Sequence, residues 1–329
     1  MTVLAPFSAD VLRIDAVRIS AELQAFLRET IFHRLRRRGL VVGLSGGIDS
    51  SVVAALATAA LGPDRVLGLM MPEVDSSGDS ERLAGMLTHA LGIRTVREDI
   101  APVLSAAGCY RRRDEAIRSV VPEYGDGWRC KIVLPDHISR PGYPIFSVVV
   151  CSPSGEVRRM RLTLDAYLAI VAATNFKQRV RKMMEYHYAD RFRYAVAGTP
   201  NLLEYDQGFF VKLGDGAADV KPIAHLYKSQ VYQLADALGV PEEIRRRTPT
   251  TDTYPLEQTQ EEFYFGLSLE QTDLCLYARD HGIPVEEVGL ATGLAPEQVV
   301  RAFAAIDAKR EAARYLHAPP VLFHAQPEA

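Results

Sequence analysis

The sequence feature that most constrains the fold is a short apolar run followed by a glycine- and serine-rich turn and a second apolar run. Residues 41–44 have the length and composition of a buried strand, and residues 52–57 are typical of a helix. The turn between them reads Ser-Gly-Gly-Ile-Asp-Ser-Ser. Paired glycines let the backbone approach an anion closely, and a helix N-terminus supplies unpaired N–H groups and the positive end of the helix dipole. The pattern therefore predicts a strand–turn–helix unit that binds phosphate.

One acidic residue, Asp49, lies in this turn, where a phosphate is expected. A carboxylate there is explained if a divalent cation lies between it and the phosphates, because Mg²⁺ is held by one or two carboxylates plus phosphate oxygens. No lysine follows the glycines, so the turn differs from the GxxxxGK[ST] loop. A turn that only caps a core helix is the alternative, but the position of the whole string favours the phosphate site. Its candidate phosphate-binding residues are Gly43, Ser45, Gly46, Gly47, Asp49, Ser50 and Ser51.

Further strands and helices alternate around this unit. Residues 65–71, 93–100 and 194–198 are predicted strands, and residues 14–38 and 81–91 are predicted helices. Alternation at this spacing predicts an α/β fold, a doubly wound parallel sheet with right-handed crossovers. Ligands of such sheets lie outside the carboxyl ends of the strands, where the glycine-rich turn is expected.

The alternation is interrupted at residues 103–162, which we interpret as a β-rich insertion with a hairpin near its end. Long insertions in α/β domains are functional lids, interface elements or solvated decorations, and these readings stay open. A helix is expected from Thr163, and a second one from Phe176 to Phe192 with a cap at Asn175. Cations in the first turns of that second helix oppose its dipole, which favours an anionic ligand or a partner carboxylate nearby.

We expect two parts in the chain: a domain at residues 1–265 that contains the insertion, and a helical extension at residues 266–329. Two helices of the extension flank a Thr-Gly turn, like a helix-turn-helix with Lys309, Arg310 and Arg314 as its basic flank. A DNA reader needs a basic face, and these helices carry many acids. Packing on the core or on a dimer partner is the favoured role, with residues 319–323 as a docked apolar tail.

Charge and cysteine content narrow the class of protein. The net charge of −3 gives no global field that would recruit nucleic acid or an anionic membrane. Four widely spaced cysteines, without a CxxC pair or a Cys/His cluster, indicate free thiols in a reducing compartment rather than a zinc site. No secretory leader and no membrane-spanning apolar run is recognised, so a cytoplasmic protein is expected.

Further motifs follow in order: NFKQRVR at residues 175–181, GTPNLLE at 198–204, GFFVKLGDGAAD at 208–219, LYKSQ at 226–230 and PTTD at 249–252. Together with SGGIDSS, they resemble the ammonia-dependent NAD synthase family, N-type PP-loop ATP pyrophosphatases with an adenine nucleotide alpha hydrolase-like fold. The resemblance covers about residues 39–102 and 166–265. It implies a homodimer and an enzyme that adenylates the carboxylate of deamido-NAD with ATP and Mg²⁺, after which ammonia displaces AMP.

The resemblance also implies roles for single residues. Asp49 and Glu204 match the magnesium ligands, and Arg179 and Thr199 match ATP contacts. Lys228 and Thr250 match phosphate-binding positions, and Asn175, Lys212 and Asp215 match the pocket of the second nucleotide. The implied catalytic residues are Asp49, Lys212, Asp215 and Lys228. No glutamine-hydrolysing domain is recognised before the turn, so ammonia is expected to be free or to come from a separate partner.

Several alternatives stay open. The chain departs from the family pattern at residues 200–203, after Asp252 and in the insertion, so an enzyme that amidates another carboxylic acid is one alternative. Transfer of nitrogen or sulfur to a tRNA or a nucleobase is another, although neither a basic RNA surface nor a catalytic cysteine pair is evident. A nucleotide-sensing or DNA-binding module that uses the C-terminal helices is the third.

Overall fold

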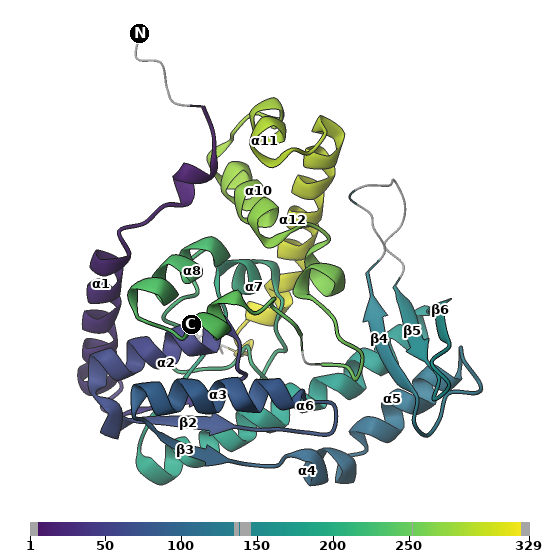
Figure 1. Cartoon of the computed structure of the whole chain (residues 1–329), viewed down its shortest axis with the longest axis horizontal. Helices are drawn as coiled ribbons and strands as arrows, with labels where there is room; N and C mark the ends of the chain where they lie inside the picture. The colour runs from purple at the N-terminus through teal and green to yellow at the C-terminus, as the bar shows by residue number, and fades with distance from the viewer. Residues whose placement is uncertain (1–5, 135–137, 139–145, 252, 324–329) are drawn as a thin grey trace, which may run out of the picture.

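A four-stranded parallel sheet forms the centre of the molecule (Figure 1). The computed structural model describes residues 6–134, 138, 146–251 and 253–323. The strands lie in the order β3-β2-β1-β7 and all neighbouring pairs are parallel. They comprise β1 (Leu40–Gly43), β2 (Val66–Met70), β3 (Arg94–Arg97) and β7 (Ala195–Ala197). The parallel sheet and its four strands, as predicted from the sequence, are confirmed.

Helices cover both faces of this sheet. Leu40 and Val42 of β1 point to one face and pack with α1 (Ala16–Arg28), α2 (Ile48–Leu61), α3 (Gly78–Leu91), α8 (Lys228–Ala237) and α9 (Glu242–Arg246). Val41 points to the other face, because side chains alternate along a strand, and packs with α4 (Ala101–Ala106) and α6 (Leu164–Phe192). Short turns of helix, Ala9–Leu12, Glu29–Arg34 and Pro63–Arg65, precede or join these elements. The doubly wound arrangement is therefore confirmed.

One continuous helix, α6, replaces the two helices expected between Thr163 and Phe192. Thr163 caps its start as predicted, since its hydroxyl accepts the N–H of Ala166 at 3.2 Å. The predicted cap at Asn175 is wrong: this residue lies inside the helix, and no glycine or proline interrupts residues 164–192. Lys177 and Arg179 are consequently far from a helix start, and the dipole argument for an anion beside them does not hold.

The insertion is only partly β-rich. Its first part forms α4 and α5 (Cys109–Arg118), which the sequence pattern did not predict. Cys109, Arg113 and Ile117, spaced four residues apart, are the buried positions of α5, which packs along α6. The second part forms an antiparallel sheet in the order β4-β5-β6, made of β4 (Arg129–Val133), β5 (Ser147–Cys151) and β6 (Val157–Arg161). The predicted hairpin is confirmed by the β5–β6 pairing.

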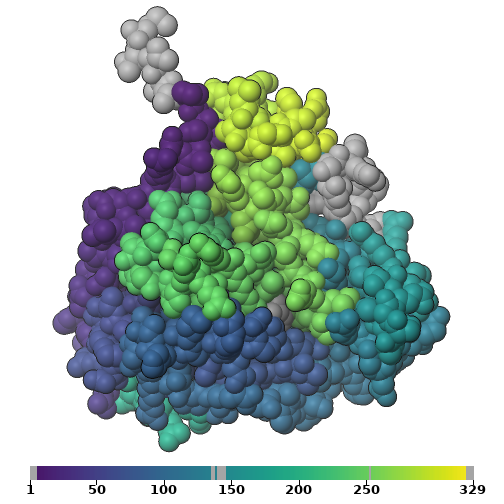
Figure 2. Space-filling model, in the orientation of Figure 1, coloured from purple at the N-terminus to yellow at the C-terminus, as the bar shows by residue number. Residues whose placement is uncertain are grey.

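The C-terminal helices form the upper part of the molecule in Figures 1 and 2. They are α10 (Leu269–His281), α11 (Val285–Thr292) and α12 (Pro296–His317), and they share a hydrophobic cluster with Leu203 of α7 (Leu202–Gln207) and Phe265 of the helical turn Glu261–Phe265. The apolar side chains of Val321, Leu322 and Phe323 are exposed in the single chain, so the predicted tail does not dock on the core. None of the helices in the described ranges is long and apolar enough to cross a membrane.

The basic flank of α12 contacts the protein itself. Arg310 forms ion pairs with Asp206 at 2.7 Å and with Asp280 at 2.8 Å. Lys309 donates a hydrogen bond to the carbonyl oxygen of Tyr264 at 2.8 Å. These two cations are therefore engaged by α7, α10 and the turn before α10, and they do not form a basic surface for DNA.

Candidate functional site

A cavity of about 590 Å³ lies at the carboxyl end of the parallel sheet. Its walls come from the turn between β1 and α2, the loop between β2 and α3, the middle of α6, and the segments that follow β7 and α9. Parallel sheets bind ligands at this edge because their connecting loops converge there. The cavity therefore lies where the sequence pattern predicts a site.

Two serines of the glycine-rich turn form hydrogen bonds within the turn and fix its shape. The Ser45 and Ser50 hydroxyls lie 3.2 Å apart, and Ser45 Oγ accepts the N–H of Gly47 at 3.2 Å. Gly46 has φ = 73°, and a Cβ there would lie 2.4 Å from the carbonyl oxygen of Ser80, so only glycine fits. Gly47 begins α2 without a side-chain cap, which leaves N–H groups of the first helical turn for a ligand.

A buried group of charges lies beside this turn. Asp49 forms an ion pair with Lys228, whose side chain is 1% exposed, and accepts a hydrogen bond from Asn201 Nδ2 at 3.0 Å. Asn201 also caps α7, where its side chain accepts the N–H of Glu204 at 3.2 Å. Glu204 Oε1 accepts a hydrogen bond from Gln260 Nε2 at 2.9 Å. Four distant segments of the chain thus bring two carboxylates to one corner of the cavity.

These two carboxylates share one lysine. Burial, followed by the negative charge of Asp49, raises the pKa of Glu204 to about 8, although Lys228 opposes the shift. Burial lowers the pKa of Lys228, but Asp49 and Glu204 outweigh it and the net shift is upward. A proton or a further cation is consequently needed to balance the charge here.

The donor set at this corner fits Mg²⁺. The structure, over the residues it describes, contains no group of three or more His, Cys, Asp or Glu side chains that could hold a metal. Two carboxylates with phosphate and water oxygens suit Mg²⁺, which rarely uses an all-protein cage. The buried Gln260 Oε1 has no hydrogen-bond partner in the described structure and adds a further oxygen near Glu204.

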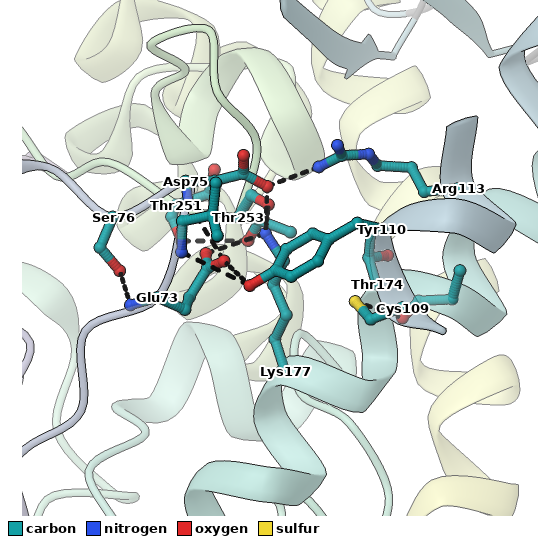
Figure 3. A network of polar contacts seen from close by, with 12 residues as sticks. Glu73, Asp75, Ser76, Cys109, Tyr110, Arg113, Thr174, Lys177, Thr251 and Thr253 are labelled. Atoms are coloured by element: carbon teal, nitrogen blue, oxygen red, sulfur yellow. Dashed lines mark hydrogen bonds and ion pairs between the residues drawn. The ribbon is translucent and has the colours of Figure 1, made fainter. Parts of the chain in front are cut away.

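A second buried cluster, which we call the Lys177 cluster, comprises Glu73, Asp75, Tyr110, Arg113 and Lys177 (Figure 3). Lys177 Nζ donates to Glu73 at 2.9 Å and to Asp75 at 2.6 Å. Arg113 of α5 pairs with Asp75 at 2.5 Å, and the Tyr110 hydroxyl donates to Glu73 at 2.8 Å. Two cations balance two carboxylates, so the loop after β2 is fixed to α5 and α6.

A third pair of charges lies further along α6. Lys182 and Glu185 form an ion pair at 2.5 Å, and burial raises the pKa of Glu185. Asp215 accepts the N–H of Val211 at 2.7 Å, and burial raises its pKa as well. Gly43 is needed beside this pair, because a Cβ there would lie 2.6 Å from Glu185 Oε1. Lys182, Glu185 and Asp215 all line the cavity.

The structure brings most of the predicted site residues to the cavity wall. Those that line it are Gly43, Ser45, Gly47, Asp49, Ser50, Asn175, Thr199, Glu204, Asp215 and Thr250. Gly46, Ser51 and Lys228 lie behind this wall, and the Ser51 hydroxyl donates to the carbonyl oxygen of Gly47 at 2.8 Å. Lys228 reaches the site through Asp49.

Two further predicted residues, Lys212 and Arg179, are absent from the cavity wall and make their contacts elsewhere. Lys212 Nζ donates to the carbonyl oxygens of Tyr315 at 2.7 Å and Ala318 at 3.1 Å, so it binds the C-terminal end of α12. Arg179 is exposed, and its Nε donates to the carbonyl oxygen of Lys212 at 3.3 Å. Neither side chain has a hydrogen bond or an ion pair with Asp49, Glu204 or Lys228 in the described structure.

Sequence reasoning missed several residues of the site. Glu73 and Asp75 follow β2 directly, and acids after a parallel strand are a signal that could have indicated them. The sequence showed Lys177 as a cation on a predicted helix but could not indicate its partners, which lie 102 and 104 residues away. Gln260 carries no signal, because an amide side chain on a loop is common.

Asp273 of α10 supports the helix that carries Lys228. Its two carboxylate oxygens accept the N–H of Lys228 at 3.1 Å and of Ser229 at 2.7 Å, and the residue is fully buried. Burial raises the pKa of Asp273 to about 6, although the two N–H groups oppose the shift. A carboxyl with a raised folded-state pKa stabilises the protein most at low pH, and this stability is lost as pH rises through that pKa.

We therefore expect the wild-type protein to lose stability relative to Asp273→Asn as pH rises. Between pH 5 and 7.5 the difference in free energy of unfolding should shift by about 1 kcal/mol in favour of the variant. Urea unfolding of both proteins at the two pH values measures it. A difference that stays constant with pH would show that Asp273 does not titrate in this range.

The turn after β1, with an acid at the helix start in place of the P-loop lysine, places the protein among α/β nucleotide-binding proteins of the PP-loop fold. The family model described as NAD synthase matches residues 19–120 and 154–316. The chain belongs to the NAD synthase family.

Relatives agree with this assignment. An NH(3)-dependent NAD(+) synthetase from Mesorhizobium japonicum is 60% identical over 296 residues, which cover 90% of this chain and 93% of the relative. A protein of the same name from Rhizobium meliloti is 58% identical and covers 96% of this chain and 94% of the relative. The solved structure of an NMN synthetase from Francisella tularensis has a TM-score of 0.65 at 22% identity, covers 95% of this chain and 100% of that chain, and supports the fold.

Proposed function

We propose that the protein is an ammonia-dependent NAD synthase that uses ATP to convert the carboxylate of deamido-NAD into an amide. ATP adenylates the carboxylate and releases pyrophosphate, and ammonia then displaces AMP to give NAD. The observation that carries this proposal is the pair Asp49 and Glu204 beside the glycine-rich turn, in a chain that belongs to this family. The names of the relatives cited above support the choice of reaction.

On the ATP side of the cavity, the glycine-rich turn and the pair Asp49 and Glu204 have separate roles. N–H groups at the start of α2 and the hydroxyls of Ser45 and Ser50 face the place for the triphosphate. Asp49 and Glu204 would hold Mg²⁺, which supplies positive charge against the charge that develops on the leaving pyrophosphate. Lys228 forms an ion pair with Asp49 and so places a buried positive charge beside that carboxylate.

Other side chains of the cavity wall suit the second nucleotide. Arg181 lines the cavity and offers positive charge for a diphosphate. Phe146 and Tyr167, which stack with ring centroids 4.4 Å apart, add an aromatic surface for a planar ring. Asn175 and Asp215 lie at the same cavity and are our candidates for polar contacts with deamido-NAD.

We also propose a homodimer that works in the cytoplasm with free ammonia or a separate ammonia-supplying partner. The four cysteines are buried and unpaired, which fits a reducing compartment. Val157, Met160, Leu164 and Leu168 are exposed apolar side chains on β6 and the start of α6, and they suit a surface covered by a second copy. Light scattering coupled to gel filtration would give the mass of the assembly, and a monomer at micromolar concentration would contradict this part.

The reaction is tested by measuring pyrophosphate release from ATP and Mg²⁺ in the presence of ammonium. We expect release only when deamido-NAD is added, with NAD formed in equal amount, and loss of release on chelation of the metal. Nicotinate mononucleotide is the comparison acceptor, because it carries the same carboxylate without the adenylate half. Preference for that acceptor, or release without any acceptor, would overturn the assignment of deamido-NAD.

A further inference from the structure

The family model leaves a gap at residues 121–153, and this gap contains β4 and β5. With β6 they form the small antiparallel sheet at the side of the molecule, next to α5. None of these strands contributes a residue to the cavity wall, apart from Phe146 just before β5. The sheet therefore has no direct role in the site described above. Any influence of the sheet on the site has to act through the segments that the sheet contacts.

One edge of the sheet is occupied by residues 253–262, which we call the wall segment. Thr253, Tyr254 and Gln260 of this segment line the cavity. Gln260 also donates the hydrogen bond to Glu204 described above, at 2.9 Å. The inner side of the wall segment thus touches a proposed metal ligand directly.

The outer side of the wall segment lies along β4. The N–H of Leu256 donates to the carbonyl oxygen of Cys130 at 3.2 Å, and the side-chain amide of Gln258, only 3% exposed, donates to the carbonyl oxygen of Ile132. The outward-facing edge of β4 is thereby paired with a loop instead of a strand. In Figure 2 the surface of this part of the chain (light green) borders the teal insertion.

Lys131, between these two positions on β4, adds a charged contact. Its ammonium donates to the carbonyl oxygen of Glu257 at 3.1 Å and forms an ion pair with Glu262 at 2.8 Å. The side chain of Lys131 is 18% exposed, so solvent screens the pair only in part. Lys131 therefore joins both halves of the wall segment to the sheet.

The wall segment has a second anchor on the opposite side. Lys177 Nζ donates to the carbonyl oxygen of Thr253 at 2.7 Å, which ties the start of the segment to the Lys177 cluster (Figure 3). Gln260 follows Gln258 and precedes Glu262, both of which contact β4, and its own N–H donates to the carbonyl oxygen of Pro249 at 3.2 Å. The sheet on one side and residues 249–251 on the other therefore hold the backbone from which Gln260 reaches Glu204.

We propose that the β4–β6 sheet is a support that positions the wall segment, and that Lys131 is a positioning residue for Glu204, acting through Gln260. Without Lys131, the wall segment between Glu257 and Glu262 becomes more mobile. The hydrogen bond from Gln260 to Glu204 is then formed for a smaller fraction of the time. This inference rests on the proposed function for its kinetic consequence, since Glu204 is there a ligand of Mg²⁺. The mobility of the wall segment does not depend on that function.

Lys131→Met tests the proposal, with Arg159→Met as its matched control. Val149 of β5 pairs with Lys131 on one side and with Arg159 on the other, so the two cations occupy the same row at opposite edges of the sheet. Hydrogen exchange followed by mass spectrometry reports on the wall segment without any substrate. We expect about tenfold faster exchange in residues 253–262 for Lys131→Met and no change for Arg159→Met, because two charge-assisted bonds are lost only in the first.

The kinetic arm uses the whole enzyme with ATP, ammonium and deamido-NAD. For Lys131→Met we expect the Mg²⁺ concentration at half-maximal rate to rise about tenfold, with a smaller change in kcat and recovery in Lys131→Arg. A purely structural role of Lys131 would lower kcat and the amount of folded protein together and leave the Mg²⁺ dependence unchanged. Glu262→Gln removes the same ion pair from the other side and replaces Lys131→Met if that variant does not fold.

The outcomes separate this proposal from the proposed function. Unchanged exchange in residues 253–262 overturns the support role, whatever the activity. Faster exchange with an unchanged Mg²⁺ dependence overturns the positioning role of Lys131. If the wild-type protein releases no pyrophosphate with deamido-NAD, the proposed function fails, and the exchange experiment still decides whether the sheet holds the wall segment.

Discussion

Replacing Asp49 with asparagine is expected to lower the rate of pyrophosphate release by about a thousandfold. The carboxylate of Asp49 lies at the start of α2, accepts from Asn201 and pairs with Lys228. Asparagine keeps its shape but removes the charge that would hold Mg²⁺ against the phosphates. The rate is measured with saturating ATP, ammonium and deamido-NAD, over a range of Mg²⁺ concentrations.

The fold should survive this change, because Lys228 retains a carboxylate. Glu204 lies close enough for its charge to raise the pKa of Lys228, and the charge of Asp49 is one cause of the raised pKa of Glu204. Without Asp49, Glu204 therefore ionises more readily and balances the lysine. Asp79→Asn is the control, since Asp79 is an exposed acid at the start of the neighbouring helix α3 and pairs with Arg82. A rate for Asp49→Asn within tenfold of the wild type would rule out the metal role.

The parts of the fold that could be predicted from the sequence are those with a repeated local pattern. The four strands of the parallel sheet are short apolar runs separated by helical stretches, and all four were placed within three residues of the observed bounds. α5 was missed because its buried face includes Arg113, which a hydrophobicity pattern counts as exposed. Its charge is balanced by the neighbouring Asp114 and by Asp75, which is 38 positions away in sequence.

The continuous helix α6 shows the opposite error. Asn175 and Gln178 match the spacing of a helix cap, and such a pattern predicts a helix start. The surrounding residues are good helix formers, and both sides of α6 are packed, with Ile170 in the insertion core and Val180 against the parallel sheet. Tertiary packing thus outweighs a local cap signal.

The site was predictable where one segment carries the chemistry. The residues of the turn from Ser45 to Ser51 are sufficient to predict an anion site. Glu204 was assigned as a magnesium ligand from the family resemblance. Lys212 could not be placed, because its partners at the end of α12 are more than 100 residues away. The same holds for the Lys177 cluster, in which α5, α6 and the loop after β2 meet only in the folded protein.

Replacing Lys177 with methionine is expected to reduce the free energy of unfolding by about 3–5 kcal/mol. Its ammonium has three acceptors, Glu73, Asp75 and the carbonyl oxygen of Thr253, and both ion-paired side chains are at most 5% exposed. Methionine fills a similar volume but leaves a buried carboxylate without its cation. Arg113 still pairs with Asp75, so the uncompensated charge falls mainly on Glu73.

A double-mutant cycle separates the missing charge from the missing volume. Glu73→Gln together with Lys177→Met removes both partners, and we expect the double variant to recover about half of the stability lost by Lys177→Met alone, because no buried charge is left unpaired. Urea unfolding of the wild type, both single variants and the double variant gives the coupling. Additive losses would show that Lys177 acts through packing alone. Recovery would establish that charge balance between Lys177 of α6 and Glu73 of the loop after β2 stabilises this wall of the cavity.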